Sequence, residues 1–186
     1  MPNLMVGAET SLLGTRWDNS EIAIAPEEIH QDSRFNPIPI AQAKAQAWSQ
    51  KNHYLLLQEY QTAKNIAAQL GVVVKDEPIP TGSNLLQINR QLIGLNRATY
   101  ISIVNKLGAI MPNPGPICGD LVTQNHLLLL GNRRILWAIA QKLRTPLPPL
   151  PQLSGIMAEQ NYQMLLGNLR ALEAIALKVD AIATGL

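Results

Sequence analysis

Two stretches of the chain, NHLLLLGNRRILWAIAQKL (125–143) and NYQMLLGNLRALEAIALKV (161–179), are identical at 11 of 19 positions. The pattern returns in NRQLIGLNRATYISIVNKL (89–107), with 7 identities to the first stretch, and in NHYLLLQEYQTAKNIAAQL (52–70), with 8. Successive copies are offset by 36 or 37 residues. Repeats of this length are typical of stacked supersecondary units. The sequence therefore predicts four copies of one structural unit.

The 13 prolines separate these copies. A proline inside a helix costs about 3 kcal/mol, so the proline-free windows are expected to be helices. The expected helices cover about 41–71, 83–108, 120–144 and 154–186. Four proline-rich runs read as extended connectors: NPIPI (36–40), EPIPTG (77–82), PNPGPICG (112–119) and PLPPLPQLSG (146–155). The fold class is all-α: four repeated helices with coiled-coil or bundle packing, joined by proline-rich connectors.

The connectors allow two arrangements of the helices. A helix of 24 residues is about 36 Å long, and an extended connector of 11 residues spans about 34 Å. A connector can therefore return to the start of its helix, which would make successive helices parallel neighbours. It can equally bulge out between the segments of a straight rod. Ser83, Asp120 and Ser154 follow three of the connectors and are expected to be N-caps.

The helices carry a heptad pattern with asparagine in the apolar seam. Three helices have two asparagines seven residues apart at position d, and the fourth has Asn52 and Glu59 there. The expected seam residues are Asn89, Asn96, Asn125, Asn132, Asn161, Asn168, Leu129, Leu136, Ile139, Leu165, Leu172 and Ile175. Polar seam residues fix register and oligomer state, so this pattern favours association of several copies around an axis. Two alternatives stay open, a half-exposed helix face and pairing within one chain.

Glycine recurs inside three of the expected helices, at Gly94, Gly131 and Gly167. Glycine costs about 1 kcal/mol relative to alanine in a helix. Its recurrence one or two residues before the second seam asparagine indicates the close approach of another backbone.

Residues 1–36 differ from the rest, which we read as the four-repeat body, residues 37–186. The segment has six acidic and two basic residues, a balance of −4, while the remainder of the chain carries +6. Short apolar patches are separated by polar residues, and we interpret the segment as an extended arm that docks onto a partner. The expected docking residues are Leu4, Met5, Val6, Leu12, Leu13, Trp17, Ile22 and Ile24.

The sequence gives little sign of catalytic or ligand chemistry. The histidines His30, His53 and His126 lack the spacing of a metal site, and Cys118 has no companion cysteine. The net charge of the chain is only +2, so we expect no nucleic-acid partner. No apolar run reaches the roughly 20 residues that a membrane span needs. We therefore expect no enzyme activity, no cofactor, no metal, no membrane partner and no secretion signal.

Short heptad segments interrupted by proline and glycine loops, with asparagine in the seam and a non-helical N-terminal arm, resemble the segmented coiled-coil fibres of tailed bacteriophages. The fibritin-like whisker proteins are the nearest comparison. The resemblance covers about residues 40–186 and is one of pattern rather than of motif. It implies a homotrimer in the virion, present in the host cytoplasm during assembly and anchored to a larger protein assembly through residues 1–36. The chain departs from those proteins in ending without a tip domain, which favours a collar or adaptor role.

Two function classes follow from these patterns. One is a structural assembly protein of a virion, a fibre, collar or adaptor that self-associates through its asparagine seams. The other is a compact monomeric helical bundle that recognises a protein partner. In an oligomer the asparagines would face their symmetry mates, whereas in a monomer they would pair within the chain.

Overall fold

Local capping signals explain where the helices begin and end. In the computed structural model, which describes residues 40–183, the helices are α1 (Ile40–Gln69), α2 (Leu85–Leu107), α3 (Leu121–Leu143) and α4 (Met157–Lys178). Asp120 caps α3 as predicted, its Oδ1 accepting a hydrogen bond from the Thr123 amide at 2.8 Å. Asn84, rather than the predicted Ser83, caps α2 by accepting from the Gln87 amide.

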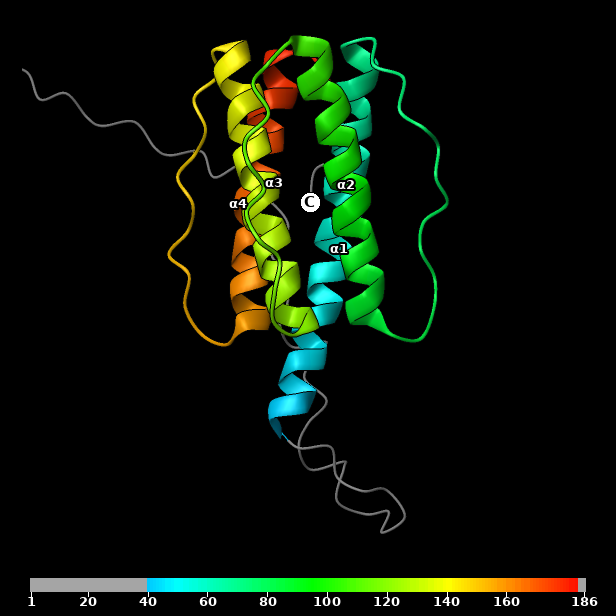
Figure 1. The fold of residues 1–186 in the computed structure, drawn as a ribbon, viewed down its shortest axis with the longest axis vertical. Coiled ribbons are helices and arrows are strands. Elements are labelled where there is room, and N and C mark those ends of the chain that lie inside the picture. Colours follow the sequence, from blue (N-terminus) through cyan, green and yellow to red (C-terminus); the bar gives the residue numbers. More distant parts are fainter. Residues whose placement is uncertain (1–39, 184–186) are drawn as a thin grey trace, which may run out of the picture. The chain divides into compact units, whose positions relative to one another are not determined.

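The four helices form a closed ring in which each one packs against two neighbours, α1 against α2 and α4, and α3 against α2 and α4 (Figure 1). All four run in the same direction. A parallel order is possible because each connector returns along the outside of the bundle to the start of the next helix. The connectors are the thin extended segments in Figure 1. Of the two arrangements that the connector lengths allow, the structure adopts the folded-back one.

The C-terminal ends of the four helices all have the same type of turn. In each repeat, a residue with positive φ follows the helix: Gly71 (65°), Gly108 (59°), Arg144 (54°) and Asp180 (56°). The next residue then donates its amide to a carbonyl five residues back, as Ala109 does to Val104 at 3.1 Å. This pattern satisfies carbonyls that the end of a helix leaves free.

The predicted end of the last helix is wrong. We expected a helix over 154–186, but α4 covers only Met157–Lys178. At its C-terminus Asp180 adopts positive φ, and the Ala181 amide donates back to Ala176 at 2.9 Å, which terminates the helix. At its N-terminus Ser154 is not the cap, because Ile156 holds that position without a side-chain hydrogen bond.

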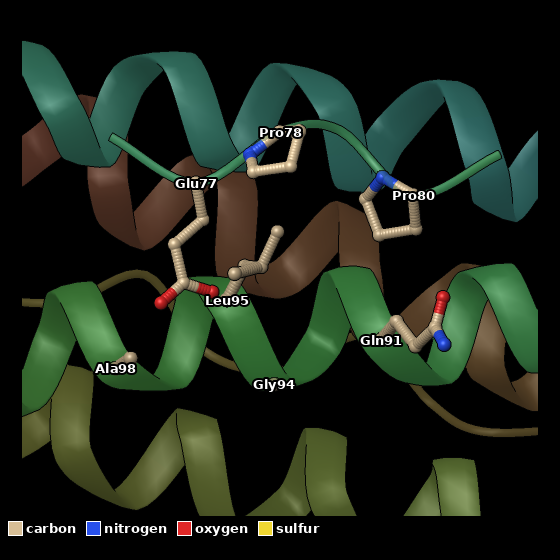
Figure 2. Close-up of a pocket in the computed structure, with 7 residues that line it drawn as sticks. All are labelled: Glu77, Pro78, Pro80, Gln91, Gly94, Leu95 and Ala98. Carbon is tan, nitrogen blue, oxygen red and sulfur yellow. The ribbon is translucent and has the colours of Figure 1, made fainter. Parts of the chain in front are cut away.

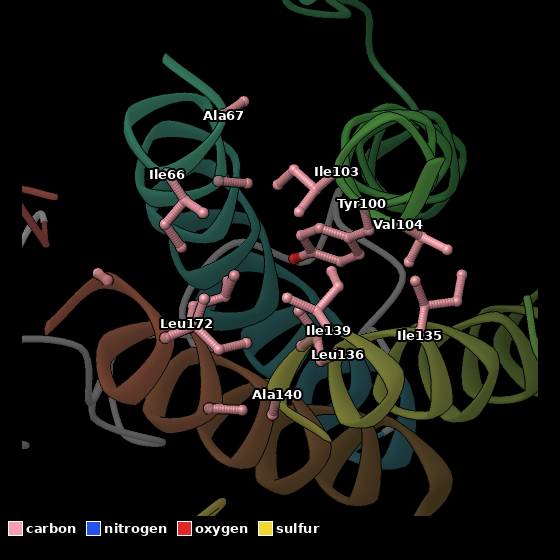
Figure 3. Packing of buried hydrophobic residues seen from close by; sticks show 14 residues of the cluster. Ile66, Ala67, Tyr100, Ile103, Val104, Ile135, Leu136, Ile139, Ala140 and Leu172 are labelled. Carbon is pink, nitrogen blue, oxygen red and sulfur yellow. The ribbon is translucent and has the colours of Figure 1, made fainter. Parts of the chain in front are cut away.

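The C-terminal halves of the helices enclose an apolar core built in layers (Figure 3). One layer contains Tyr100 together with Ala63, Leu136 and Leu172, all at equivalent repeat positions and all no more than 1% exposed. The small Ala63 leaves the space that the tyrosine ring needs, as close packing of an interior requires.

The recurring glycines lie beneath the returning connectors. A Cβ atom added to Gly167 would lie 2.8 Å from Leu150 Cδ2 and 3.0 Å from Pro151 Cδ, both in the connector that leads into α4. At Gly131 it would meet the Arg97 guanidinium at 2.7 Å. The close neighbours are therefore connector and side-chain atoms, with one backbone oxygen, that of Pro114, 3.8 Å from the Cβ position at Gly131.

Gly94 is the exception, because an added Cβ would meet nothing within 4 Å. The preceding connector stands away from α2 here and leaves a shallow pocket of about 380 Å³. Figure 2 shows Glu77, Pro78 and Pro80 of the connector facing this part of the helix.

We predict opposite effects of alanine at two of the helix-interior glycines. Gly94→Ala should raise the free energy of unfolding by about 0.5–1 kcal/mol, because it improves helix propensity in open space. Gly167→Ala should lower it by about 1 kcal/mol or more, because Pro151 has to move. Urea unfolding followed by circular dichroism measures both. Equal stabilisation by the two variants would show that the connector does not press on α4.

Candidate functional site

The asparagines form two polar rings inside the bundle. In the first ring, each side-chain amide donates to a backbone carbonyl of the neighbouring helix. Asn89 donates to Ser49 (2.8 Å), Asn125 to Leu86 (3.2 Å), Asn161 to Val122 (3.2 Å) and Asn52 to Ala158 (3.1 Å). Each acceptor lies three residues before the ring asparagine of its own helix. The four bonds therefore close a circle, with the bond from Asn52 joining α1 back to α4.

The second ring lies seven residues further along each helix. Three of its members again donate to the carbonyl three residues before the ring residue of the neighbouring helix. Asn96 donates to Leu56 (3.2 Å), Asn132 to Ile93 (3.2 Å) and Asn168 to Leu129 (3.5 Å). The three amides are fully buried. The fourth member is Glu59, which stands where the other helices have asparagine. The equivalent acceptor for Glu59 would be the carbonyl of Leu165.

Residues that directly follow the ring asparagines support their orientation. His53 Nδ1 lies 3.1 Å from Asn89 Oδ1, and His126 Nδ1 lies 2.9 Å from Asn161 Oδ1. Because the Nδ2 of each asparagine donates to a carbonyl, its Oδ1 must accept, which places a proton on each histidine Nδ1. These two histidines are thus structural hydrogen-bond donors.

Glu59 is a carboxyl group with no exposed surface. Its Oε2 accepts from Asn96 Nδ2 and from the Tyr100 hydroxyl, both at 3.2 Å. Burial outweighs these two hydrogen bonds and raises the pKa of Glu59 from 4.5 to about 8. At neutral pH the group is therefore mainly a neutral acid, and only in that form can it donate a hydrogen bond as the asparagines do.

Every residue predicted for the seam is buried inside this single chain. The six asparagines are at most 3% exposed and the six apolar seam residues at most 1%. The structure brings them together around the axis of one bundle, and the asparagine amides bond within the chain. The predicted docking residues of the arm, from Leu4 to Ile24, lie outside the described residues. Cys118 is exposed in its connector.

The sequence pattern missed two parts of this arrangement. Glu59 was visible at position d, but its neutral state depends on burial that periodicity does not report. The acceptors were also missed, because a backbone carbonyl three residues before an asparagine has no signature in the sequence.

The part of the chain from 40 to 183 has no cluster of three or more metal-ligating acidic, histidine or cysteine side chains. Among these residues no helix is long and apolar enough to cross a membrane. Comparison with known proteins gives no match to a family model, to a curated protein or to a solved structure. The two rings are therefore the most distinctive polar feature of the described body.

We predict that the ring bonds stabilise the bundle. Asn132→Leu should lower the free energy of unfolding by about 1–3 kcal/mol, because the amide that bonds Ile93 is lost. The exposed Asn105 of α2 provides a matched control, and Asn105→Leu should change stability by less than about 0.5 kcal/mol. Guanidinium unfolding measures both. A rise in stability for Asn132→Leu would contradict the stabilising role of the ring.

We also predict that Glu59 makes stability depend on pH. Between pH 4.5 and about 8 the folded chain keeps a proton on Glu59 that the unfolded chain releases. The stabilisation is therefore complete below pH 4.5 and is lost as pH rises towards 8, with a total effect of several kcal/mol.

Glu59→Gln, which keeps a donor without the titration, should flatten this pH dependence and raise stability at pH 8. The exposed Glu77 gives the control, and Glu77→Gln should keep the wild-type slope. Thermal unfolding across this pH range is the measurement. An unchanged slope in Glu59→Gln would show that Glu59 ionises in the folded chain as it does in water.

Proposed function

We propose that this chain is a non-catalytic assembly protein. Its body is a self-contained parallel bundle, and it joins a larger protein assembly through residues 1–36. The observation that carries the proposal is the closed circle of four ring bonds, in which Asn52 returns from α1 to α4 of the same chain. A circle closed within one chain gives each side-chain N–H group of the first ring an acceptor without a second copy.

The buried polar groups support a structural role. The ring amides and both ring histidines bond neighbouring helices. Among residues 40–183, the pocket beside Gly94 is shallow and has one carboxylate, Glu77, which already pairs with Lys75 at 3.3 Å. A rigid body of this kind suits a connector between other proteins.

The setting of this proposal comes from the sequence pattern. A fibre, collar or adaptor of a tailed bacteriophage virion remains the setting that the heptads, the connectors and the acidic arm favour. In that setting a fibre would be a homotrimer, whereas an adaptor could work as one closed bundle. In the fibre the ring hydrogen bonds would join helices of different chains, whereas in the adaptor they join helices of the same chain.

Light scattering after dilution separates the two forms. We predict that the dilute protein has the mass of one chain, 20.4 kDa, because its ring bonds are satisfied internally. Deleting residues 1–36 should leave the protein as a single chain and its helix content nearly unchanged, while attachment to the larger assembly is lost. A mass of three chains that survives both dilution and arm deletion would contradict the single-chain body and favour the fibre.

A further inference from the structure

One end of the bundle exposes an apolar side chain from every repeat. The residue two positions after each positive-φ turn is apolar and exposed in all four copies: Val73, Ile110, Pro146 and Ile182. Val73 is 96% exposed, Ile110 90% and Ile182 77%. Leu177, in the last turn of α4, adds a fifth exposed apolar side chain at this end. We call the surface formed by these five residues the tip.

The apolar residues of the tip are unusual within the described chain. Val73, Ile110, Leu177 and Ile182 are the four most exposed large apolar side chains among residues 43–183. Each lies in the last turn of a helix or within four residues after its end, so the most exposed apolar side chains share one end of the bundle.

Cations lie near the tip in three of the four repeats. Lys106, Lys142 and Lys178 each precede a tip residue by four positions, and all three are exposed. Arg144 adds a fourth cation between two of the repeats. Ion pairs in the described body engage Lys64 and Lys75, so these four cations are unpaired there. The nearby acids are Asp180 and Asp76, of which Asp76 is already paired with Lys64 at 2.8 Å, so the unpaired charges at this end are mostly positive.

Charge complementarity identifies the partner within this chain. Residues 1–36 are the one acidic segment of the sequence, at −4 against +6 for the rest, and they alternate apolar patches with acids. We propose that the tip binds the acidic residues 1–36 of a second copy. This inference rests on the proposed assembly function and names the surface that receives the arm.

Chain length favours a second copy over the same copy. α1 begins at the end of the bundle opposite the tip, and its 30 residues span about 45 Å. Extended chain covering that distance uses about 14 residues, roughly 26–39. In the same copy, Glu27, Glu28 and Asp32 would then lie alongside the bundle and could not reach the tip. An arm from another copy can bring all its acids to the tip.

An arm bound to the tip of the next copy is a head-to-tail contact. Such contacts use two different surfaces and therefore extend into open chains unless the rotation between copies closes a ring. The ring-bonded bundle would supply the rigid unit of that chain, and the arm would supply the link. The contact should weaken with added salt, because much of its attraction is between exposed charges.

Sedimentation velocity of the full-length chain over a wide concentration range tests the proposal. We expect reversible association that salt weakens. Replacing Lys106, Lys142 and Lys178 by Glu, or Val73 and Ile110 by Asp, should weaken association at least about tenfold. Lys44→Glu with Tyr54→Asp changes exposed residues of α1 that lie at least 15 residues before its C-terminal end, and should have little effect.

Charge exchange is the sharper test. Glu27→Lys with Glu28→Lys should weaken association alone and restore it when combined with Lys106→Glu and Lys142→Glu. A labelled peptide of residues 1–36 should bind the full-length protein and lose that binding in the tip variants. Absence of rescue would overturn the inference, as would binding of the tip to phosphatidylserine vesicles but not to the peptide.

The outcomes separate this inference from the proposed function. If the protein is a single chain when dilute and the tip substitutions do not change its association at higher concentration, the inference is overturned and the assembly function stands. A chain that stays monomeric at every concentration, with its arm bound to its own tip, also overturns it. A trimer that persists without residues 1–36 overturns the proposed single-chain assembly protein itself.

Discussion

The hydrogen bond from an asparagine side chain to a carbonyl of the neighbouring helix is the constraint on which the bundle depends. Each acceptor lies three residues before the ring asparagine of its own helix, as Ser49 does before Asn52. This rule can be repeated around a closed ring only if all four helices are parallel and in register. The side-chain N–H groups of the ring asparagines therefore reach their acceptors in one alignment of the helices, which gives the polar rings a role in specificity as well as stability.

Parallel order imposes a second requirement, since each connector must run the whole length of a helix. The proline-rich segments meet it because an extended chain covers distance with few residues. They also cover the outer faces of the helices, where Gly167 leaves room for Leu150 and Pro151. The same segments that break the sequence into helices thus protect the apolar faces that an isolated coiled coil would expose.

Much of the fold follows from sequence, and the missing part has a physical reason. The repeat and the prolines predict four helices, and Asp120 is the cap that its position after a connector indicates. The heptads predict which side chains are buried but not whose helices bury them, because a period of 3.5 residues is the same within and between chains. The neutral state of Glu59 and the positive φ of Arg144 depend on surroundings that no local pattern encodes.

The central claim is that the ring bonds close within one chain. An isotope-filtered NMR experiment on a mixture of labelled and unlabelled protein tests it directly, because it separates contacts within a chain from contacts between chains. The account predicts that contacts from the Asn52 side-chain amide to residues around Ala158 arise within the labelled chain. The same contacts seen only between labelled and unlabelled chains would contradict it.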